Sequence, residues 1–88
     1  MRFEWDRVKN RANLAKHGID LADAVAVFED EFARTRPDLG AHGEQRFVTL
    51  GVDGFGRHLT VVFTERGSRI RVISARLATK QERKFYET

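Results

Sequence analysis

Residues 69–76 read Arg-Ile-Arg-Val-Ile-Ser-Ala-Arg, and this stretch decides the fold that we expect for the chain. Its β-branched residues and the alternation of charged with apolar side chains predict a buried β-strand. The strand carries Arg69, Arg71 and Arg76, and arginine is costly to place in an element that also has to pack. An anionic group, on either a partner protein or a substrate, is expected to compensate this cost.

The patterns on either side of this strand predict two further strands and a final helix. Gly67-Ser68 is typical of a two-residue hairpin turn, so residues 57–66 form the neighbouring antiparallel strand. Residues 53–56 form the preceding turn, and residues 46–52 form the strand before it. Residues 79–82 have the Thr-x-x-Glu spacing of a capping box, which begins a short C-terminal helix.

The chain begins with an alternating stretch and a capped helix. Residues 2–5 suit a short edge strand. Asp6 and Gly18 are placed to cap a helix over residues 7–16 at its two ends. This helix is thinly amphipathic, with three apolar residues at helical spacing, Val8, Ala12 and Ala15.

A second helix is expected to begin at Asp20, because four apolar residues then share one face: Leu21, Ala24, Val25 and Phe28. Residues 32–36 are a weak strand candidate, and residues 37–43 are a loop by their Pro and Gly content. The fold class is therefore α+β, a single domain over residues 1–88. Two N-terminal helices pack on a small antiparallel sheet of about four strands, followed by a short C-terminal helix.

The hairpin turn sets which side chains share a face of the sheet. A two-residue loop pairs Arg66 with Arg69, and the faces alternate from there. The core face then holds Leu59, Val61, Phe63, Ile70 and Val72. The other face holds Arg66, Arg69 and Arg71, whose like charges suit the binding of an anion. Alternatively, these arginines reach into solvent and pair with Glu65 or Glu87.

Two more arginines are expected on the core face, near its rim. A four-residue turn before the second strand places Arg46 opposite Phe63, and the same counting places Arg76 opposite Leu59. A guanidinium at the rim of the core needs an acceptor, which can be a carboxylate or a substrate phosphate. Glu44 lies two residues from Arg46 and can act either as a local ion-pair partner or as a catalytic group.

The composition excludes several classes of protein. The chain of 88 residues has no cysteine, so it can form neither a disulfide framework nor a thiolate metal site. Its three histidines do not have metal-site spacing, and we expect no metal and no cofactor. No apolar run reaches the roughly 20 residues of a membrane span. We therefore expect a cytoplasmic protein.

Positive charge is concentrated in the second half of the chain. Residues 1–45 hold seven Lys/Arg and nine Asp/Glu, a balance of −2, whereas residues 46–88 hold nine and four, a balance of +5. Twelve of the sixteen basic residues are arginine, which binds phosphate and carboxylate groups in a bidentate manner. This half is a candidate surface for nucleic acid or another anion, although the charge alone is equally compatible with a solvated surface.

These features resemble the BrnT toxin family along nearly the whole chain. The resemblance is carried by Phe3-Glu4-Trp5-Asp6, Asn13-Leu14-Ala15-Lys16-His17-Gly18, residues 24–28, 44–47, 62–66 and 70–76, and by Thr79, Glu82 and Tyr86. It implies a RelE-like fold and a metal-independent ribonuclease that arrests growth by cutting RNA. It also implies a cognate BrnA-like antitoxin with a ribbon-helix-helix DNA-binding domain, and a complex that represses its own operon.

Metal-free RNA cleavage needs a base, an acid and cations beside the phosphate. Arg76 is our first candidate for stabilising the transition state and Arg46 the second, while the candidates for proton transfer are His17, Glu44 and Tyr86. Arg66, Arg69, Arg71 and Lys16 are candidate RNA contacts. His17 can instead shape only the helix end, and Tyr86 can stack on a base or pack in the core. The alternatives to an active ribonuclease are a non-catalytic binding module with a basic sheet face and an inactive toxin that retains the antitoxin interface.

Overall fold

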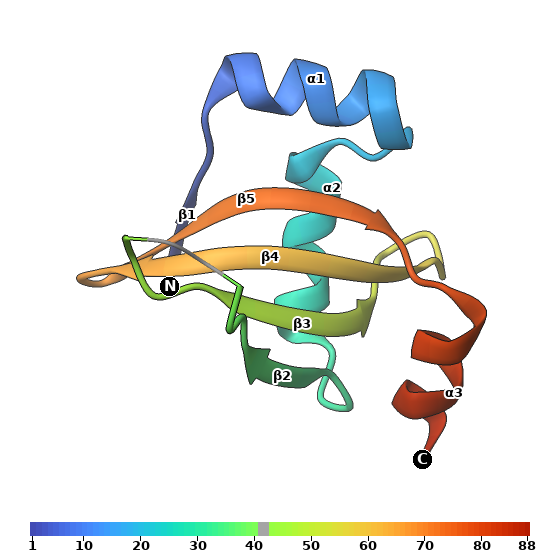
Figure 1. Ribbon diagram of the computed structural model, residues 1–88. Coiled ribbons are helices and arrows are strands. Elements are labelled where there is room, and N and C mark those ends of the chain that lie inside the picture. The colour runs from blue at the N-terminus through green and yellow to red at the C-terminus, as the bar shows by residue number, and fades with distance from the viewer. Residues whose placement is uncertain (41–42) are drawn as a thin grey trace.

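The protein is built on a five-stranded mixed β-sheet with helical segments around it (Figure 1). The computed structural model describes residues 1–40 and 43–88. The strands lie in the order β1-β5-β4-β3-β2. In chain order the elements are β1 (Arg2–Glu4), α1 (Arg7–His17), α2 (Leu21–Ala24), the 3₁₀ helix η1 (Val25–Glu29), β2 (Arg34–Pro37), β3 (Phe47–Val52), β4 (His58–Arg66), β5 (Arg69–Leu77) and α3 (Lys80–Glu87). Within the described ranges, none of the helices has the length and hydrophobicity of a membrane span.

The sheet departs from the expected antiparallel sheet of about four strands both in pairing and in strand number, which is five. The expected N-terminal edge strand is present as β1, but it pairs in parallel with β5, from Arg2 opposite Arg69 to Glu4 opposite Arg71. At the other edge the weak strand candidate is confirmed as β2, which pairs antiparallel with β3 and ends at Pro37. Proline is tolerated there because one side of an edge strand needs no hydrogen-bond donor. Part of the expected 37–43 loop, residues 41–42, lies outside the described residues.

The N-terminal helices differ from expectation in length and packing. α1 is capped as expected, since Asp6 accepts a bond from the Lys9 amide at 3.0 Å and Gly18 has a φ of 71°. Its apolar stripe, however, faces solvent: Val8 is 68% exposed and Asn13 is the one buried residue of the helix. The second helix has one α-helical turn, α2, before it tightens into η1.

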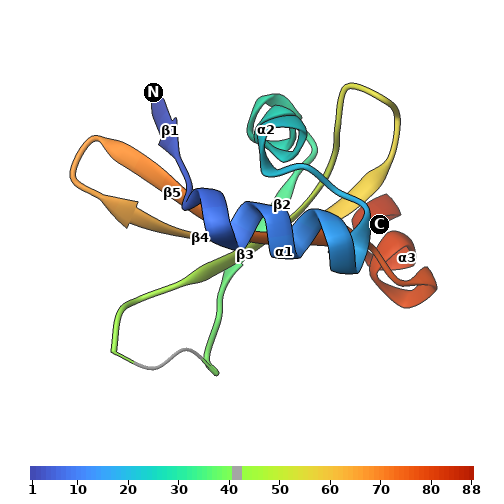
Figure 2. The ribbon, with the colours of Figure 1, turned by 90° about the horizontal axis from the view of Figure 1, so that it is seen from above.

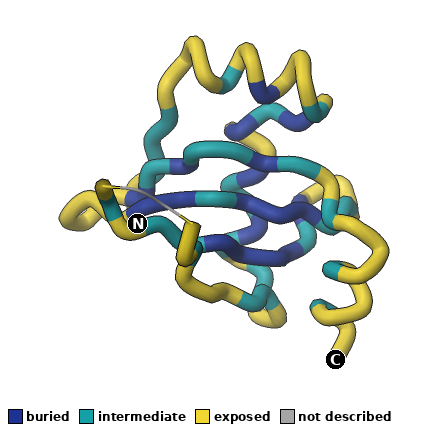
Figure 3. Tube along the Cα trace, in the orientation of Figure 1, coloured by how far each residue is buried: buried dark blue, intermediate teal, exposed yellow. Residues whose placement is uncertain are grey.

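The core lies between the sheet and the α2–η1 segment. Leu21, Ala24 and Val27 are fully buried there against Leu59 and Val61. Gly51 of β3 allows the close approach, because a Cβ atom at this position would lie 2.9 Å from Cβ of Val27. Figure 2 shows α2 on one side of the sheet, and Figure 3 shows burial concentrated in α2, β3 and β4 while α1 and α3 are mostly exposed. The core-face residues expected on β4 and β5 are all buried.

The register of the β4–β5 hairpin is confirmed near the turn and wrong beyond it. The pairs run as expected from Arg66 opposite Arg69 to Phe63 opposite Val72. A β-bulge then shifts the register, so that Val62 pairs with Ser74 and Ile73 is the extra residue. Arg76 consequently lies opposite Thr60 rather than opposite Leu59, and the buried Ala75 takes the core-facing position.

The prediction that Arg46 lies opposite Phe63 is also wrong, because the turn before β4 is one residue longer than expected. The turn between β3 and β4 has five residues, because Val52 pairs with His58. Phe47 therefore lies opposite Phe63, and their rings stack with centroids 5.5 Å apart. Arg46 precedes the strand, one position away from the core-facing site.

Candidate active site on the outer face of the sheet

A row of paired residues crosses four strands on the face of the sheet opposite to α2. Arg34 pairs with Leu50, Leu50 with Thr60, and Thr60 with Arg76. Directly paired residues point to the same side of a sheet, and Leu59 and Val61 on either side of Thr60 point into the core. The row therefore defines the other side, which is called the outer face below.

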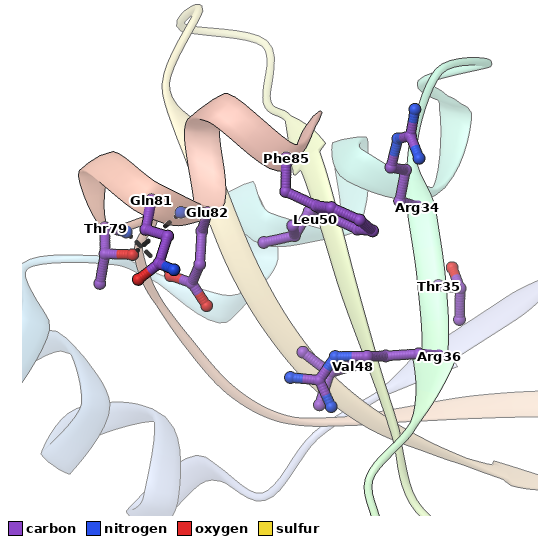
Figure 4. A pocket seen from close by; sticks show the side chains of 9 residues that line it. All are labelled: Arg34, Thr35, Arg36, Val48, Leu50, Thr79, Gln81, Glu82 and Phe85. Atoms are coloured by element: carbon purple, nitrogen blue, oxygen red, sulfur yellow. Dashed lines mark hydrogen bonds between the residues drawn. The ribbon is translucent and has the colours of Figure 1, made fainter. Parts of the chain in front are cut away.

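Helix α3 completes a groove of about 630 Å³ on the outer face (Figure 4). Val48 and Leu50 of β3 lie between a wall from β2, with Arg34 and Arg36, and a wall from α3. Phe85 of α3 contacts Arg34, whose guanidinium carbon lies 4.9 Å from the centre of the Phe85 ring. The other lining residues are Thr35, Thr79, Gln81 and Glu82. The groove thus combines an apolar interior with two cations at one rim.

Arg76 adjoins this groove through a bidentate bond to Glu82. Its Nη1 and Nη2 atoms donate to the two carboxylate oxygens at 2.7 and 3.0 Å. The bond from Arg76 and a further bond from the Thr79 amide lower the pKa of Glu82 to about 2, although burial opposes the shift. Glu82 is also the capping-box residue of α3, as the sequence predicts. A carboxylate therefore occupies the arginine fork in the way that a phosphate can.

Tyr86 and Asp30 connect α3 to the segment that follows η1. The Tyr86 hydroxyl donates to Asp30 Oδ2 at 2.5 Å, and this oxygen also accepts a bond from the Val52 amide at 2.9 Å. The ring of His58 packs edge-on against Tyr86, with centroids 5.2 Å apart. Burial raises the pKa of Asp30, but the bond from Tyr86 and two backbone amide bonds outweigh it, so the net shift is downward.

The hydroxyl of Tyr86, the chain's single tyrosine, is expected to ionise at about pH 12 instead of 10.0, because the Asp30 carboxylate raises its pKa. The hydrogen bond's contribution to stability is then fully present below pH 10.0 and is lost as the pH rises through about 12. An absorbance titration of tyrosinate measures this pKa, and Asp30→Asn should return it toward 10.0. Ionisation at 10.0 in the unsubstituted protein would contradict the assignment.

The other arginines predicted as functional form ion pairs with glutamates. Glu44 binds Arg46 at 3.6 Å and Arg66 at 3.2 Å, so the expected local ion pair is present. Glu4 of β1 binds two more, Arg69 at 3.2 Å and Arg71 at 3.0 Å. The alternative in which these arginines are ion-paired therefore holds, but the partners are Glu44 and Glu4 rather than Glu65 and Glu87.

His17 and Lys16 lie in the last turn of α1. No hydrogen bond or ion pair within residues 1–40 and 43–88 joins either of them to Arg76 or Glu82. In the same part of the chain, no group of three or more His, Asp or Glu side chains is placed to hold a metal ion. The expected site residues thus separate into the Arg76 groove, the Glu44 and Glu4 clusters, and the end of α1.

Much of this groove carries no recognisable sequence motif. Arg34 and Arg36 belong to no motif, although their spacing of two residues on a strand candidate places both on one face. The capping box indicates only a structural role for Glu82, and no motif indicates a function for Phe85 or His58. Their proximity depends on the packing of α3 beside β2 and β3, which no local pattern reports.

Comparison with known proteins identifies the family of the chain. Residues 5–82 match the sequence model of a family described as "Ribonuclease toxin, BrnT, of type II toxin-antitoxin system". The crystal structure of the Brucella abortus ribonuclease toxin BrnT matches with a TM-score of 0.73 and 30% sequence identity. The match covers 91% of this chain and 99% of that one. No curated protein sequence matches the chain.

The fold and the family match thus define a toxin of a type II toxin–antitoxin system, from a family of ribonucleases. The chain belongs to the BrnT family. This membership confirms the family resemblance of the sequence motifs, and it implies an antitoxin partner and an RNA target.

Proposed function

We propose that this protein is a metal-independent endoribonuclease whose active site is the outer-face groove. The observation that carries the proposal is that Arg34 and Arg36 line an apolar groove with Phe85 on its α3 wall, and that Arg76 binds Glu82, another residue of the lining. Cations at two rims can hold consecutive phosphates of an RNA strand, and an aromatic ring between them can stack on a base.

The reaction that suits this site uses the RNA's own 2′-hydroxyl as nucleophile. Its oxygen attacks phosphorus, the bond to the 5′-oxygen breaks, and the products are a 2′,3′-cyclic phosphate and a 5′-hydroxyl. One group takes the proton of the 2′-hydroxyl and another gives a proton to the leaving oxygen. The extra negative charge develops on phosphorus oxygens, where a guanidinium stabilises it.

Arg76 is the residue that we propose for this stabilisation. An RNA phosphate exchanges with Glu82 for the bidentate fork, which releases the carboxylate during binding. His58 is our candidate for proton transfer, since it precedes Thr60 by two residues on the same face of β4 and an imidazole can both accept and donate a proton. The pKa of about 12 makes Tyr86 a poor general base, so its proposed role is to hold α3 in place.

The remaining candidates are proposed to act outside the groove. Arg66, Arg69, Arg71 and Lys16 are proposed RNA contacts, with the first three weakened by their glutamate partners. Arg46 and Glu44 bind each other, and we propose that they support RNA binding outside the groove rather than take part in cleavage. His17 is proposed to shape the end of α1.

The proposed partner is a cognate BrnA-like antitoxin with a ribbon-helix-helix domain, bound as a hetero-oligomer. Family membership supports an antitoxin of some kind. The proposal adds that the toxin meets DNA through this antitoxin, that the complex represses its operon, and that both act in the cytoplasm. It also assigns the fold to the RelE-like type.

The experiment that tests this function is RNA cleavage by the purified protein in the presence of a metal chelator. We expect the single-stranded RNA to be cut, with 2′,3′-cyclic phosphate ends identified by mass spectrometry. A matched oligonucleotide of all 2′-deoxy nucleotides lacks the nucleophile and should remain intact.

Each other outcome has a distinct meaning. Loss of cleavage on chelation would overturn metal independence. Cleavage of the deoxy oligonucleotide would overturn the 2′-hydroxyl mechanism. Binding of RNA without any cleavage would favour the non-catalytic binding module.

A further inference from the structure

Asn13 is the one buried residue of α1, and its amide forms three hydrogen bonds. Its Nδ2 atom donates to the carbonyl oxygens of Ile19 and Ala75, both at 2.9 Å. Its Oδ1 atom accepts a bond from the Ala75 amide at 3.1 Å. One side chain therefore satisfies both backbone groups of a residue that lies 62 positions away along the chain.

Ala75 lies between the β-bulge and Arg76, directly before Arg76. The bulge inserts Ile73 after the pair Phe63–Val72, and regular pairing resumes with Ser74 opposite Val62 and continues with Ala75 opposite Val61. Ala75 faces the core with no exposed surface. Its position therefore determines that the next side chain, Arg76, points to the outer face.

Within residues 1–40 and 43–88, the backbone of β5 beyond Arg71 has no strand partner on the side away from β4. β1 pairs with β5 over three residues, from Arg69 to Arg71. At Ala75 the Asn13 amide supplies the donor and the acceptor that a neighbouring strand would otherwise supply. Buried backbone groups are costly to leave without partners, so this contact favours the bulged register over others.

We propose that Asn13 is a positioning residue that holds β5 in its bulged register and thereby places Arg76 at the active-site groove. The unbulged register would put Arg76 opposite Leu59, on the core face and away from Glu82. A change of one residue in register transfers a side chain to the other face of a sheet. The inference rests on the proposed role of Arg76 in RNA cleavage, but its structural part can be measured without that activity.

The test compares Asn13→Ala with Asn10→Ala in the full-length protein. Asn10 is a matched control, since it lies one turn earlier in α1 and also forms two bonds through its side chain, to Asp20 at 3.0 Å and from the Leu21 amide at 2.9 Å. These bonds join α1 to α2 and do not touch β5. Both variants lose buried or half-buried hydrogen bonds, so a general loss of stability affects both.

Three measurements are made on samples brought to the same folded fraction. The first is the kcat and KM of RNA cleavage. The second is hydrogen exchange of the Ala75 amide. The third is the NMR signal of the Arg76 Nε–H group, which reports the environment of the guanidinium beside Glu82. The last two do not depend on ribonuclease activity.

We expect Asn13→Ala to lower kcat by about 10- to 100-fold with little change in KM, because a misplaced catalytic group affects mainly the chemical step. Exchange at Ala75 should accelerate and the Arg76 signal should shift, while Asn10→Ala leaves all three close to the unsubstituted protein. Equal effects of the two variants, or an unmoved Arg76 signal in Asn13→Ala, would overturn the proposal. If the unsubstituted protein cuts no RNA, the proposed function fails, and the NMR and exchange results alone decide the role of Asn13.

Discussion

Replacing Arg76 with alanine is expected to lower the rate of RNA cleavage by about 10²- to 10³-fold while leaving the protein folded. The guanidinium directs both Nη atoms at the carboxylate of Glu82, which lines the groove, and a pair of phosphate oxygens can be bound in the same geometry. Its side chain is 42% exposed, so its removal should change stability by no more than about 1 kcal/mol. Steady-state kinetics of the purified variant, with circular dichroism as a check of folding, measure both quantities.

Two further variants make this experiment specific. Arg11→Ala removes the same charge from the exposed surface of α1 and should cleave RNA as the unsubstituted protein does. The double variant Arg34→Gln with Arg36→Gln should raise KM more than it lowers kcat, because these arginines are proposed to bind the strand rather than the reacting phosphate. A folded Arg76→Ala protein with undiminished kcat would show that Arg76 is not the stabilising group.

The largest effect on stability is expected for Asp53→Ala, a loss of about 3 kcal/mol in the free energy of unfolding. The Asp53 side chain is fully buried in the β3–β4 turn and accepts bonds from the amides of Phe55 and Arg57, both at 2.9 Å. The Arg57 guanidinium donates to the same carboxylate at 2.8 Å. Alanine would leave all of these donors without an acceptor. Chemical denaturation at neutral pH measures the difference.

The pH dependence gives an independent check on Asp53. Burial raises the pKa of Asp53. The backbone and side-chain bonds from Arg57, together with the bond from the Phe55 amide, lower this pKa by more than burial raises it, so the net shift is downward. Its contribution to stability is therefore present above its ordinary pKa of 3.8 and is lost as the pH falls through the lower value of the folded state. Asp38→Ala is the control, since the exposed Asp38 side chain accepts one bond among the described residues, from the Gly40 amide at 3.2 Å. A change below about 1 kcal/mol for Asp53→Ala would mean that the turn is held by other contacts.

Local signals in the sequence predicted the ends of elements well. Asp6, Gly18 and Thr79 each act on backbone groups within four residues, so their roles do not depend on the rest of the fold. The pairing of Arg66 with Arg69 followed in the same way from a two-residue turn. By contrast, the spacing of Val8, Ala12 and Ala15 predicts an apolar face of α1 that packs in the core. In the structure this face lies in solvent, because the helix contacts the sheet through Asn13 instead.

The sequence by itself determined the α+β class, the three long strands, the C-terminal helix and the family, because each depends on periodicity or on motifs within short segments. It also made Arg76 the first candidate for stabilising the transition state. The tertiary structure decided where Arg76 points, since the bulge at Ile73 reverses the face and is stabilised by Asn13 from a distant helix. It alone assembled the groove, because Arg34 and Glu82 meet through the order of the strands and the packing of α3. The stretch from residue 69 to 76 therefore specifies a strand, while long-range contacts determine which of its arginines lie on the outer face beside the proposed site.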